Sequence, residues 1–471
     1  MSEVVVVGGG VAGLATALAL GRSGHRVILL ERDPLPPAAD AEEAFLASRR
    51  GAPQVHQTHG FLARIRVELR RLFPDVLEAL MDAGCHTLPL TSNLGEPRPG
   101  DEDLAVVVVR RTTFEWVLRR AVAAEPSVSF GTDRAVAGLI AEPGAAGVPV
   151  VTGVRLADGE TLPADLVVGA TGRRGPVPEW LARCGVTVPE TVHESGLMYL
   201  TRWYRLPAGF GGTMDPKLGG DLGFVKYLGV PGDAGTLSVT LAIRPDDVAL
   251  RTALSDPDGF EHACRLLPGP DQFFAHGPLE PLGGVRPMAG LLNRLRRFAA
   301  DDGSPLVHGF HAVGDAHTCT NPLYGRGCSL AVVQARLLAE AMAAHPGDHE
   351  ARSRRYERDC ATEVEPWFHL SVEMDRMGAD PAGLPTGGDD AQRRAIGAVL
   401  AAAATDPVLG RGMARLWNLL ATPAELMADP SYTVRAAEVM ANPDAYPTPA
   451  AEGPTRQELL AALGQMEGAA R

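Results

Sequence analysis

Basic residues, paired cysteines and aromatic side chains are all scarce in this chain of 471 residues. Lys and Arg total 44 against 57 for Asp and Glu, so the formal net charge is −13. An acidic chain repels phosphate backbones and anionic lipid surfaces, so we expect neither nucleic acid nor a membrane surface as a partner. Apolar residues make up 45% and charged residues 21%, an ordinary globular composition that leaves little room for long disorder.

Cysteine is also sparse, and no two cysteines form a C-x-x-C pair. The six are Cys85, Cys184, Cys264, Cys319, Cys328 and Cys360. Such scattering indicates neither a zinc site nor a disulfide framework, and it favours reduced thiols in a cytoplasmic protein. The first long apolar run, residues 4–21, lacks a basic leader and contains five glycines. We therefore expect neither a signal peptide nor a membrane span there.

The amino terminus instead has the pattern of a βαβ unit. A four-valine strand precedes a glycine turn, an Ala/Leu helix that stops near Gly24, and a second buried strand. Gly8, Gly10 and Gly13 supply the motif G-x-G-x-x-G between strand and helix. The first glycine permits the tight turn, the second lets a pyrophosphate approach, and the third lets helix and strand pack closely.

The helix that opens with Val11 and Ala12 would face this anion with free N–H groups and the positive end of its dipole. Glu31, followed by Arg32, ends the second strand and is placed to accept ribose hydroxyls. A carboxylate there repels a 2′-phosphate, so the pattern favours FAD or NAD over NADP. The fingerprint alone does not choose between FAD and NAD, because both carry the same adenosine diphosphate.

Two later segments favour FAD. Residues 163–175 form an apolar strand that ends in Ala170-Thr171-Gly172, a small-residue turn that lets a cofactor pass closely. Residues 306–331 form a strand, then Gly314-Asp315, then a Pro/Gly loop, then an apolar helix.

Taken together, these motifs resemble the p-hydroxybenzoate-hydroxylase-like class of FAD-dependent monooxygenases over most of residues 1–345. The resemblance implies that Thr171, Gly172 and Gly314 lie at the cofactor. It also implies that Asp315, with Ala316 at the same turn, holds the ribityl chain through hydrogen bonds to its hydroxyls.

The resemblance implies a further role for the Asn321–Gly327 loop. The backbone at Pro322, Gly325 and Gly327 would lie beside the flavin ring as the catalytic positions, with Cys328 behind them, and the N–H groups of this loop would point at the ring. A positive helix end there stabilises the anionic reduced flavin.

A stretch that begins at Gly51 resembles the G-V-P-Q-x-R-H-x-H segment of bacterial flavin epoxidases acting on polyene precursors of polyethers. Pro53, Gln54 and His59 agree with that segment, and Gln54 is expected at the cofactor. His56 and Gln57 stand where those enzymes tend to have Arg and His.

The helix start Arg111-x-x-Phe114-Glu115 resembles the family's arginine near the cofactor phosphates. Arg110 is the competing candidate for that role. An exposed cation at the start of a helix is the structural alternative for Arg111.

Other polar residues are assigned no chemistry. The four candidate histidines have no nearby acidic partner in the sequence, so we expect them to pack or cap rather than bind metal. They are His56, His59, His311 and His317. Cys319 and Cys328 flank the flavin loop as small apolar thiols.

The expected fold class is α/β, with four segments. A Rossmann-like FAD-binding domain would comprise residues 1–185 and 291–375, a mixed-sheet substrate domain residues 186–290, and a C-terminal helical cap residues 376–471. The substrate sheet should present an apolar wall, of which we expect half to fill core instead. Its candidate members are Met198, Tyr199, Trp203, Tyr204, Phe224 and Tyr227.

The function that fits best is an FAD-dependent monooxygenase of secondary metabolism. It would epoxidise or hydroxylate a hydrophobic organic substrate, either free or bound to a carrier. The sequence has no second G-x-G-x-x-G, so electrons would come from transiently bound NADPH or NADH or from a separate flavin reductase.

Four alternatives share parts of this pattern. One is an alkene-saturating reductase similar to geranylgeranyl reductases, and another is a non-enzymatic carrier similar to the dissociation inhibitors of prenylated proteins. A flavin halogenase is disfavoured because W-x-W-x-I-P is absent. An NAD dehydrogenase is disfavoured by Gly314-Asp315.

Overall fold

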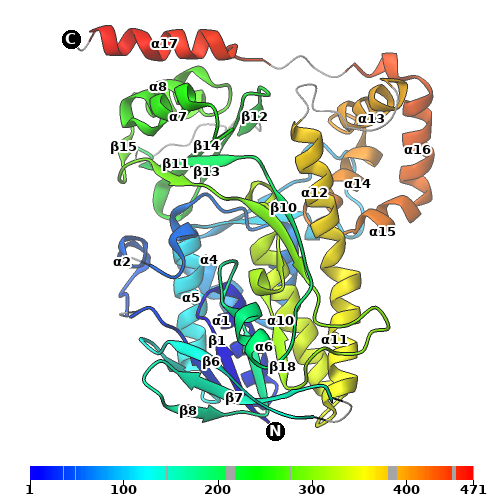
Figure 1. Ribbon diagram of the computed structural model, residues 1–471. Coiled ribbons are helices and arrows are strands. Elements are labelled where there is room, and N and C mark those ends of the chain that lie inside the picture. Colours follow the sequence, from blue (N-terminus) through cyan, green and yellow to red (C-terminus); the bar gives the residue numbers. More distant parts are fainter. Residues whose placement is uncertain are drawn as a thin grey trace.

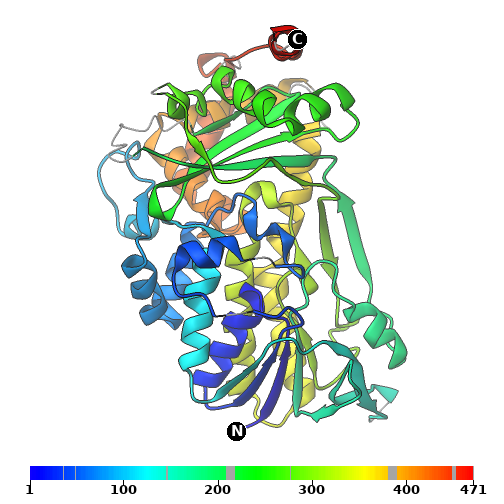
Figure 2. The ribbon, with the colours of Figure 1, turned by 90° about the vertical axis from the view of Figure 1, so that its left-hand side faces the viewer.

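The computed structural model describes residues 1–35, 37–47, 49–144, 147–207, 218–275, 277–379, 390–447 and 452–469. Two large sheets organise the molecule. The amino terminus lies in the lower sheet of Figure 1, the second sheet lies above it, and helices from the last part of the chain run along one side. Figure 2 shows the same two layers after a quarter turn.

The lower sheet is parallel and has the order β18-β9-β1-β2-β5. Its strands are β1 (Glu3–Val7), β2 (Arg26–Leu30), β5 (Val128–Gly131), β9 (Leu166–Gly169) and β18 (Phe310–Ala312). The pairing of β18 with β9 brings a late segment of the chain beside the amino-terminal strands. This arrangement confirms the Rossmann-like core.

Both faces of this sheet are covered, which explains why its central strands are almost continuously apolar. Val4 and Val6 pack in one core with three helices, while Val5 and Val7 pack in another on the opposite face. The helices are α1 (Val11–Arg22), α5 (Arg111–Ala124) and α10 (Gly327–Ala344). The opposite face meets α6 (Val177–Arg183) and a small sheet of β6 (Val136–Glu142), β7 (Val150–Leu156) and β8 (Thr161–Pro163).

The second large sheet is antiparallel in every pair. Its strands are β11 (Met198–Arg205), β12 (Gly219–Asp221), β13 (Val225–Pro231), β14 (Thr236–Ile243), β15 (Glu280–Pro281) and β16 (Arg286–Met288). The expectation of a mixed sheet is wrong here, because short links such as the one between β13 and β14 join antiparallel neighbours. The core of this sheet is shared with α7 (Val248–Ser255), α8 (Pro257–Leu266), α9 (Asp271–Phe274) and α17 (Arg456–Ala469).

Two long strands connect the sheets. β10 (Glu190–Glu194) and β17 (Leu292–Arg296) pair antiparallel, and β19 (Thr318–Cys319) pairs with β17. β3 (His86–Pro89) and β4 (Ala105–Val108) form a separate antiparallel pair earlier in the chain.

The described ranges 390–447 and 452–469 are mainly helical, as predicted for residues 376–471, and the helical part begins earlier than predicted, at His349. Its helices are α11 (His349–Glu363), α12 (Glu365–Ala379), α13 (Asp390–Ala402), α14 (Pro407–Trp417), α15 (Pro423–Ala428) and α16 (Pro430–Ala441). The expected domain limit between residues 375 and 376 falls inside α12, which runs through it. The remaining helices precede residue 83 and are α2 (Ala41–Leu46), α3 (Ala63–Leu72) and α4 (Pro74–Asp82).

Among the described residues, α10 alone is long and apolar enough to cross a membrane. However, 72% of it is buried inside the fold, as in the core helix of a globular protein.

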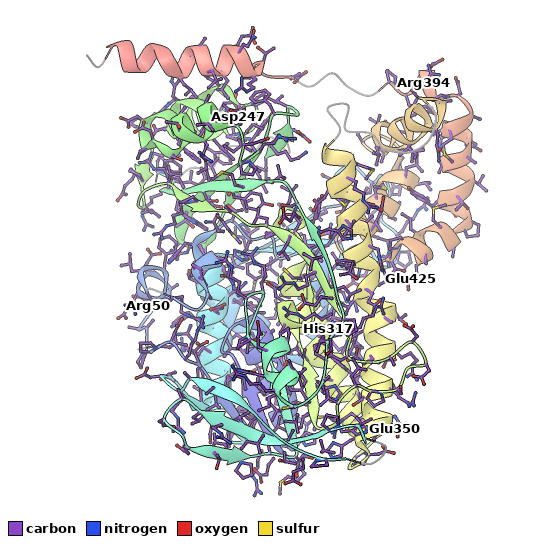
Figure 3. All side chains as sticks on the ribbon, in the orientation of Figure 1. Arg50, Asp247, His317, Glu350, Arg394 and Glu425 are labelled. Carbon is purple, nitrogen blue, oxygen red and sulfur yellow. The ribbon has the colours of Figure 1, made fainter. Side chains whose placement is uncertain are left out.

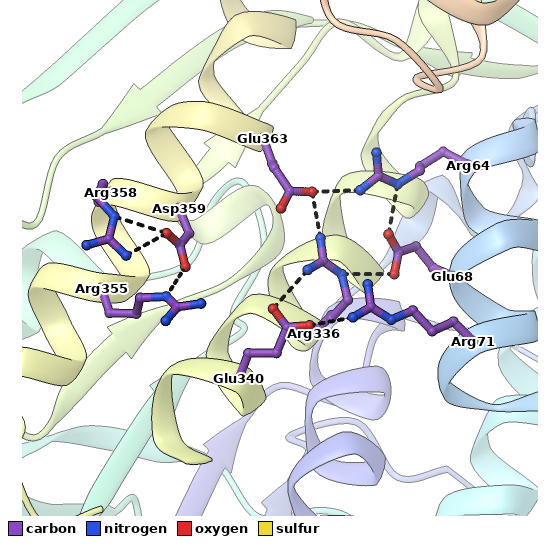
Figure 4. Close-up of polar contacts among 9 residues, drawn as sticks. All are labelled: Arg64, Glu68, Arg71, Arg336, Glu340, Arg355, Arg358, Asp359 and Glu363. Carbon is purple, nitrogen blue, oxygen red and sulfur yellow. Dashed lines mark hydrogen bonds and ion pairs between the residues drawn. The ribbon is translucent and has the colours of Figure 1, made fainter. Parts of the chain in front are cut away.

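A cluster of ion pairs ties α3, α10 and α11 together (Figure 4). Arg336 donates to Glu68 at 3.1 Å, to Glu340 at 3.0 Å and to Glu363 at 2.6 Å. Arg64 contacts Glu68 at 2.8 Å and Glu363 at 2.7 Å. Arg336 and Glu68 are both buried, so each depends on its partners for compensation of its charge.

We predict that Arg336→Met lowers the free energy of unfolding by about 2 to 3 kcal/mol. Loss of a partner leaves the buried Glu68 carboxylate with one arginine, while the half-exposed Glu340 and Glu363 recover water and reduce the penalty. Urea unfolding followed by circular dichroism measures the change.

Arg355→Met is the matched control, because Arg355 pairs with Asp359 within α11 (Figure 4) and its side chain is 35% exposed. Its substitution should leave the urea midpoint almost unchanged. Equal losses in the two variants would contradict the buried role of Arg336.

Candidate active site

Among the motif glycines Gly8, Gly10 and Gly13, only Gly10 has open space where a side chain would be. Gly8 has φ +115°, and a Cβ there would lie 2.4 Å from the Ala170 carbonyl oxygen. A Cβ on Gly13 would lie 1.7 Å from the Gly8 carbonyl oxygen. A Cβ on Gly10, by contrast, would meet no atom within 4 Å. Gly8 and Gly13 are therefore needed for packing, while Gly10 borders open space where Val11 and Ala12 begin α1.

Glu31 is buried at the end of β2 beside this turn. Its carboxylate accepts hydrogen bonds from the backbone N–H of Gly9 and of Asp33, each at 2.9 Å. Arg49 adds an ion pair at 3.2 Å. Three of about four acceptor positions are thus in use, and one is left for a ribose hydroxyl. Arg32 is exposed.

Arg49 was not singled out from the sequence. Its buried guanidinium lies 3.2 Å from Glu31, 3.4 Å from Asp33 and 2.7 Å from Glu115. No local pattern marks it, because its partners come from β2, the loop after β2, and α5.

The late Gly-Asp motif lies directly against the amino-terminal turn. A Cβ on Gly314, whose φ is +62°, would lie 2.6 Å from the Cβ of Ala12. The Gly314 N–H donates to Gln334 Oε1 at 2.7 Å. Burial raises the pKa of the adjacent Asp315 carboxyl, although Arg173 and Arg111 oppose the shift. Two segments some three hundred residues apart therefore meet at one place.

The turn after β9 lies at the same place. Ala170 contacts Gly8, as the spacing above requires, and its N–H donates to the Val7 carbonyl at 2.8 Å. The Thr171 hydroxyl is buried and has no hydrogen-bond partner among the described residues. Gly172 has φ +74°. A buried unpaired hydroxyl at this point is consistent with a bound polar group.

Arg111 is 9% exposed, so the alternative of an exposed helix-start cation is wrong. It donates to Glu115 at 2.5 Å and contacts the Cys328 sulfur at 3.0 Å. Arg110 points elsewhere, because its guanidinium forms a fully buried pair with Asp233 at 2.7 Å. Arg110 therefore links the start of α5 to the second sheet, while Arg111, like Arg173, lies near Asp315.

The loop before α10 is shaped by its own hydrogen bonds. The Gly325 N–H donates to the Pro322 carbonyl at 3.0 Å, and the Leu323 N–H donates to Asn321 Oδ1 at 3.1 Å. A Cβ on Gly325 would lie 3.3 Å from the Gly60 carbonyl oxygen. Gly325 and Pro322 therefore fix the shape of the loop. The first turn of α10, at Gly327 and Cys328, offers further backbone donors, and the place of Pro322, Gly325 and Gly327 at the flavin ring stays a prediction.

The segment before α3 packs against this loop, and its histidines are neutral at pH 7. Pro53 is exposed and Gln54 half-buried. Burial lowers the pKa of His56 to about 4. Burial and nearby Arg111 lower the pKa of His59 to about 3, and its Nδ1 lies 2.9 Å from the Gln57 carbonyl.

The other two candidate histidines are structural. His311 packs edge to face on Tyr356, with ring centroids 5.0 Å apart. His317 lies in the interior of the molecule (Figure 3), where its ring stacks on Phe298. No group of three His, Cys, Asp or Glu residues that could hold a metal occurs in the described ranges.

A cavity of about 1030 Å³ lies beside the Pro322–Gly325 loop. Among the six expected wall residues, Tyr199, Phe224 and Tyr227 line it. The other three are buried outside the cavity lining, as expected for half of the set. Further lining comes from Thr58, Gly60 and Leu62, from β12 to β14, from the end of α12, and from Trp417 of α14.

Residues 1–202 match the family model described as "FAD binding domain". This match makes FAD the cofactor and disfavours the alternative of a plain NAD dehydrogenase. The kynurenine 3-monooxygenase of Salinispora arenicola (strain CNS-205) is 27% identical over 381 residues, which cover 75% of this chain and 75% of that protein.

Two solved structures share the fold. PqsL of Pseudomonas aeruginosa, described as a probable FAD-dependent monooxygenase, has a TM-score of 0.61 at 17% identity and covers 81% of this chain and 98% of its own. The flavin-dependent brominase Bmp2 has a TM-score of 0.62 at 18% identity and covers 94% of this chain and 99% of its own.

We predict that Gly10→Ala weakens FAD binding at least tenfold without lowering the stability of the apoprotein. The added methyl meets no protein atom but occupies the space expected for the diphosphate. Fluorescence titration of the apoprotein with FAD measures the affinity, and thermal unfolding measures stability. Unchanged FAD affinity would place the diphosphate elsewhere. Gly13→Ala, which clashes with the Gly8 carbonyl, should by contrast destabilise the apoprotein itself.

Stability should fall as the pH drops below about 6.5. The unfolded chain protonates both histidines near that pH, whereas the folded chain does so only near 4 for His56 and 3 for His59. The unfolded state therefore binds more protons in this window, and folding loses up to about 1.4 kcal/mol per pH unit for each histidine.

The comparison that isolates this effect is urea unfolding at pH 7 and pH 5 with the wild type and His56→Gln. The variant should lose about 2 kcal/mol less between the two pH values. An identical pH dependence in the two proteins would show that His56 is protonated in the folded state.

Proposed function

We propose that this chain, an FAD-dependent monooxygenase, inserts one oxygen atom from O₂ into a large, mostly apolar organic molecule. The observation that carries the proposal is the cavity of about 1030 Å³ that opens onto the Pro322–Gly325 loop. That loop leads into α10, whose start lies beside Arg111 and Asp315. A substrate in the cavity would thus lie next to the flavin ring.

The residues at the turns after β1, β9 and β18, together with Glu31 after β2, fit FAD. Open space at Gly10 accommodates a diphosphate, the remaining acceptor position of Glu31 suits a ribose, and the unpaired Thr171 hydroxyl suits a polar part of the cofactor. Asp315 would hold the ribityl hydroxyls. When bound and reduced, FAD activates oxygen and supplies one oxygen atom to an electron-rich carbon.

The chain's own part in the reaction is to orient the substrate and exclude water. Tyr199, Phe224 and Tyr227 contribute aromatic surface to the cavity wall, and Trp417 and the end of α12 line another part of it. A dry, shaped pocket protects a reactive oxidant from side reactions. NADPH or NADH is the electron donor. Transfer of its electrons through a separate flavin reductase belongs to the proposal.

Cavity size argues for a substrate larger than an amino acid. The volume lies at the upper end of the range for pockets that bind drug-sized molecules. Kynurenine, which the curated relatives act on by name, is smaller than such molecules. We therefore favour a polycyclic aromatic ring or a polyene of secondary metabolism, hydroxylated or epoxidised, free or carrier-bound. The likeness of the Gly51–His59 segment to polyether epoxidases supports the polyene.

The test is a single turnover with isotopically labelled O₂. The holoenzyme is reduced anaerobically, mixed with candidate aromatic and polyene compounds, and exposed to the labelled gas. Mass spectrometry should find exactly one labelled oxygen atom in the product.

Other outcomes would separate the rival functions. A saturated alkene would indicate a reductase, and a halogenated product formed with added bromide would indicate a halogenase. A protein that binds no flavin even when FAD is added would indicate a carrier.

A further inference from the structure

Asp375 of α12 is the centre of a hydrogen-bond cluster in the wall of the cavity. Its Oδ1 accepts from Asn321 Nδ2 at 2.7 Å and from the Tyr324 hydroxyl at 2.6 Å. Its Oδ2 accepts from Asn293 Nδ2 at 2.7 Å. Asp375 and Tyr324 both line the cavity. The carboxylate thus joins α12, the Asn321–Gly327 loop and β17 at one point.

The donors around Asp375 are already in use. The Tyr324 hydroxyl donates to Asp375, and the Tyr199 hydroxyl, which also lines the cavity, donates to Asn321 Oδ1 at 2.8 Å. The Leu323 N–H donates to the same Asn321 oxygen. What these groups still offer to the cavity is oxygen lone pairs, so this part of the wall accepts hydrogen bonds rather than donating them.

The charge of Asp375 is incompletely compensated. A carboxylate has about four acceptor positions, and three are occupied, which leaves one on Oδ2. The described residues provide no ion pair within 4.0 Å of it. Arg326, the nearby cation, donates instead to Ser371 and to the Trp367 carbonyl. Burial raises the pKa of Asp375 despite its three donors. A ligand that brings one more donor would therefore be stabilised here.

We infer that Asp375 determines substrate specificity by accepting a hydrogen bond from a hydroxyl or amino group on the substrate. The inference rests on the proposed function, because it takes the cavity as the substrate site. It narrows the substrate to molecules with a donor group, such as a phenol, an aryl amine or an enol. The same hydrogen bond would hold the donor-bearing end of the substrate beside the flavin loop.

Binding of a naphthol and of its methyl ether to the holoenzyme tests this directly. The methyl ether lacks the O–H donor and carries a methyl group in its place, and flavin absorbance changes report binding without turnover. The wild type should bind the naphthol about tenfold to a hundredfold more tightly, the range for a hydrogen bond to a charged group. Asp375→Asn keeps the shape and presents an amide, so the two probes should then bind within about threefold of each other.

Two further variants separate this role from structural damage. Asp221 also lines the cavity but pairs with Lys226, so Asp221→Asn should keep the wild-type preference. Tyr324→Phe removes one donor to Asp375 and keeps the carboxylate, so it too should keep the preference even if the loop loosens. Both controls should retain FAD, as judged by the flavin spectrum.

The inference would be overturned if the wild type bound the naphthol and its methyl ether equally. It would also be overturned if the Asp375→Asn variant kept the preference for the naphthol. Failure of the proposed function gives a different result. In that case no labelled oxygen enters any product, whatever the preference between the two probes.

Discussion

The site depends on one close approach, the contact of Gly314 with Ala12. A methyl group on Gly314 would lie 2.6 Å from the Ala12 Cβ, so the backbone of the late motif touches the first turn of α1. The contact is possible because β18 pairs with β9 and β9 with β1, which brings three strand ends to one edge of the parallel sheet. Ligands of open α/β sheets bind at this carboxyl edge. Glu31, Thr171 and Asp315 reach the same edge from three separate parts of the chain.

This geometry also explains how the second sheet comes to face the cofactor. β10 and β17 form the antiparallel pair through which the chain leaves and re-enters the lower domain, and the inserted sheet lies above the lower sheet (Figure 1). The buried Arg110–Asp233 pair holds α5 against the turn between β13 and β14. Because removal of either partner would leave a buried charge, the pair favours one fixed arrangement of the two sheets. The cavity between them therefore has a defined shape.

Much of the cofactor side could be predicted from the sequence, because it is encoded in short motifs. Gly8 and Gly13 occupy positions where a side chain would clash, and Gly314 and Asp315 follow a strand in the expected way. The fold class, the helical end of the chain and the FAD cofactor were likewise predictable. The roles of Glu31, Gln54, Arg111 and the flavin-loop glycines stay predictions.

The rest of the site could not be predicted, because it is made of contacts between distant residues without a local pattern. Arg49 and Asp375 lie on unremarkable segments and gain their importance from partners elsewhere in the chain. The choice between Arg110 and Arg111 was open, since adjacent residues at a helix start point in different directions. The pair with Asp233 turns Arg110 away, and the role of Arg111 stays a prediction. Sheet type was misjudged for a similar reason, because strand pairing is a tertiary property.

The central claim is that two turns far apart in the sequence hold a single FAD. Hydrogen–deuterium exchange of the apoprotein, with and without one equivalent of FAD, tests it most directly. The account predicts simultaneous protection of backbone N–H groups in residues 8–13 and in residues 314–316, both saturating at one FAD per chain. Protection of the first turn without the second would contradict it.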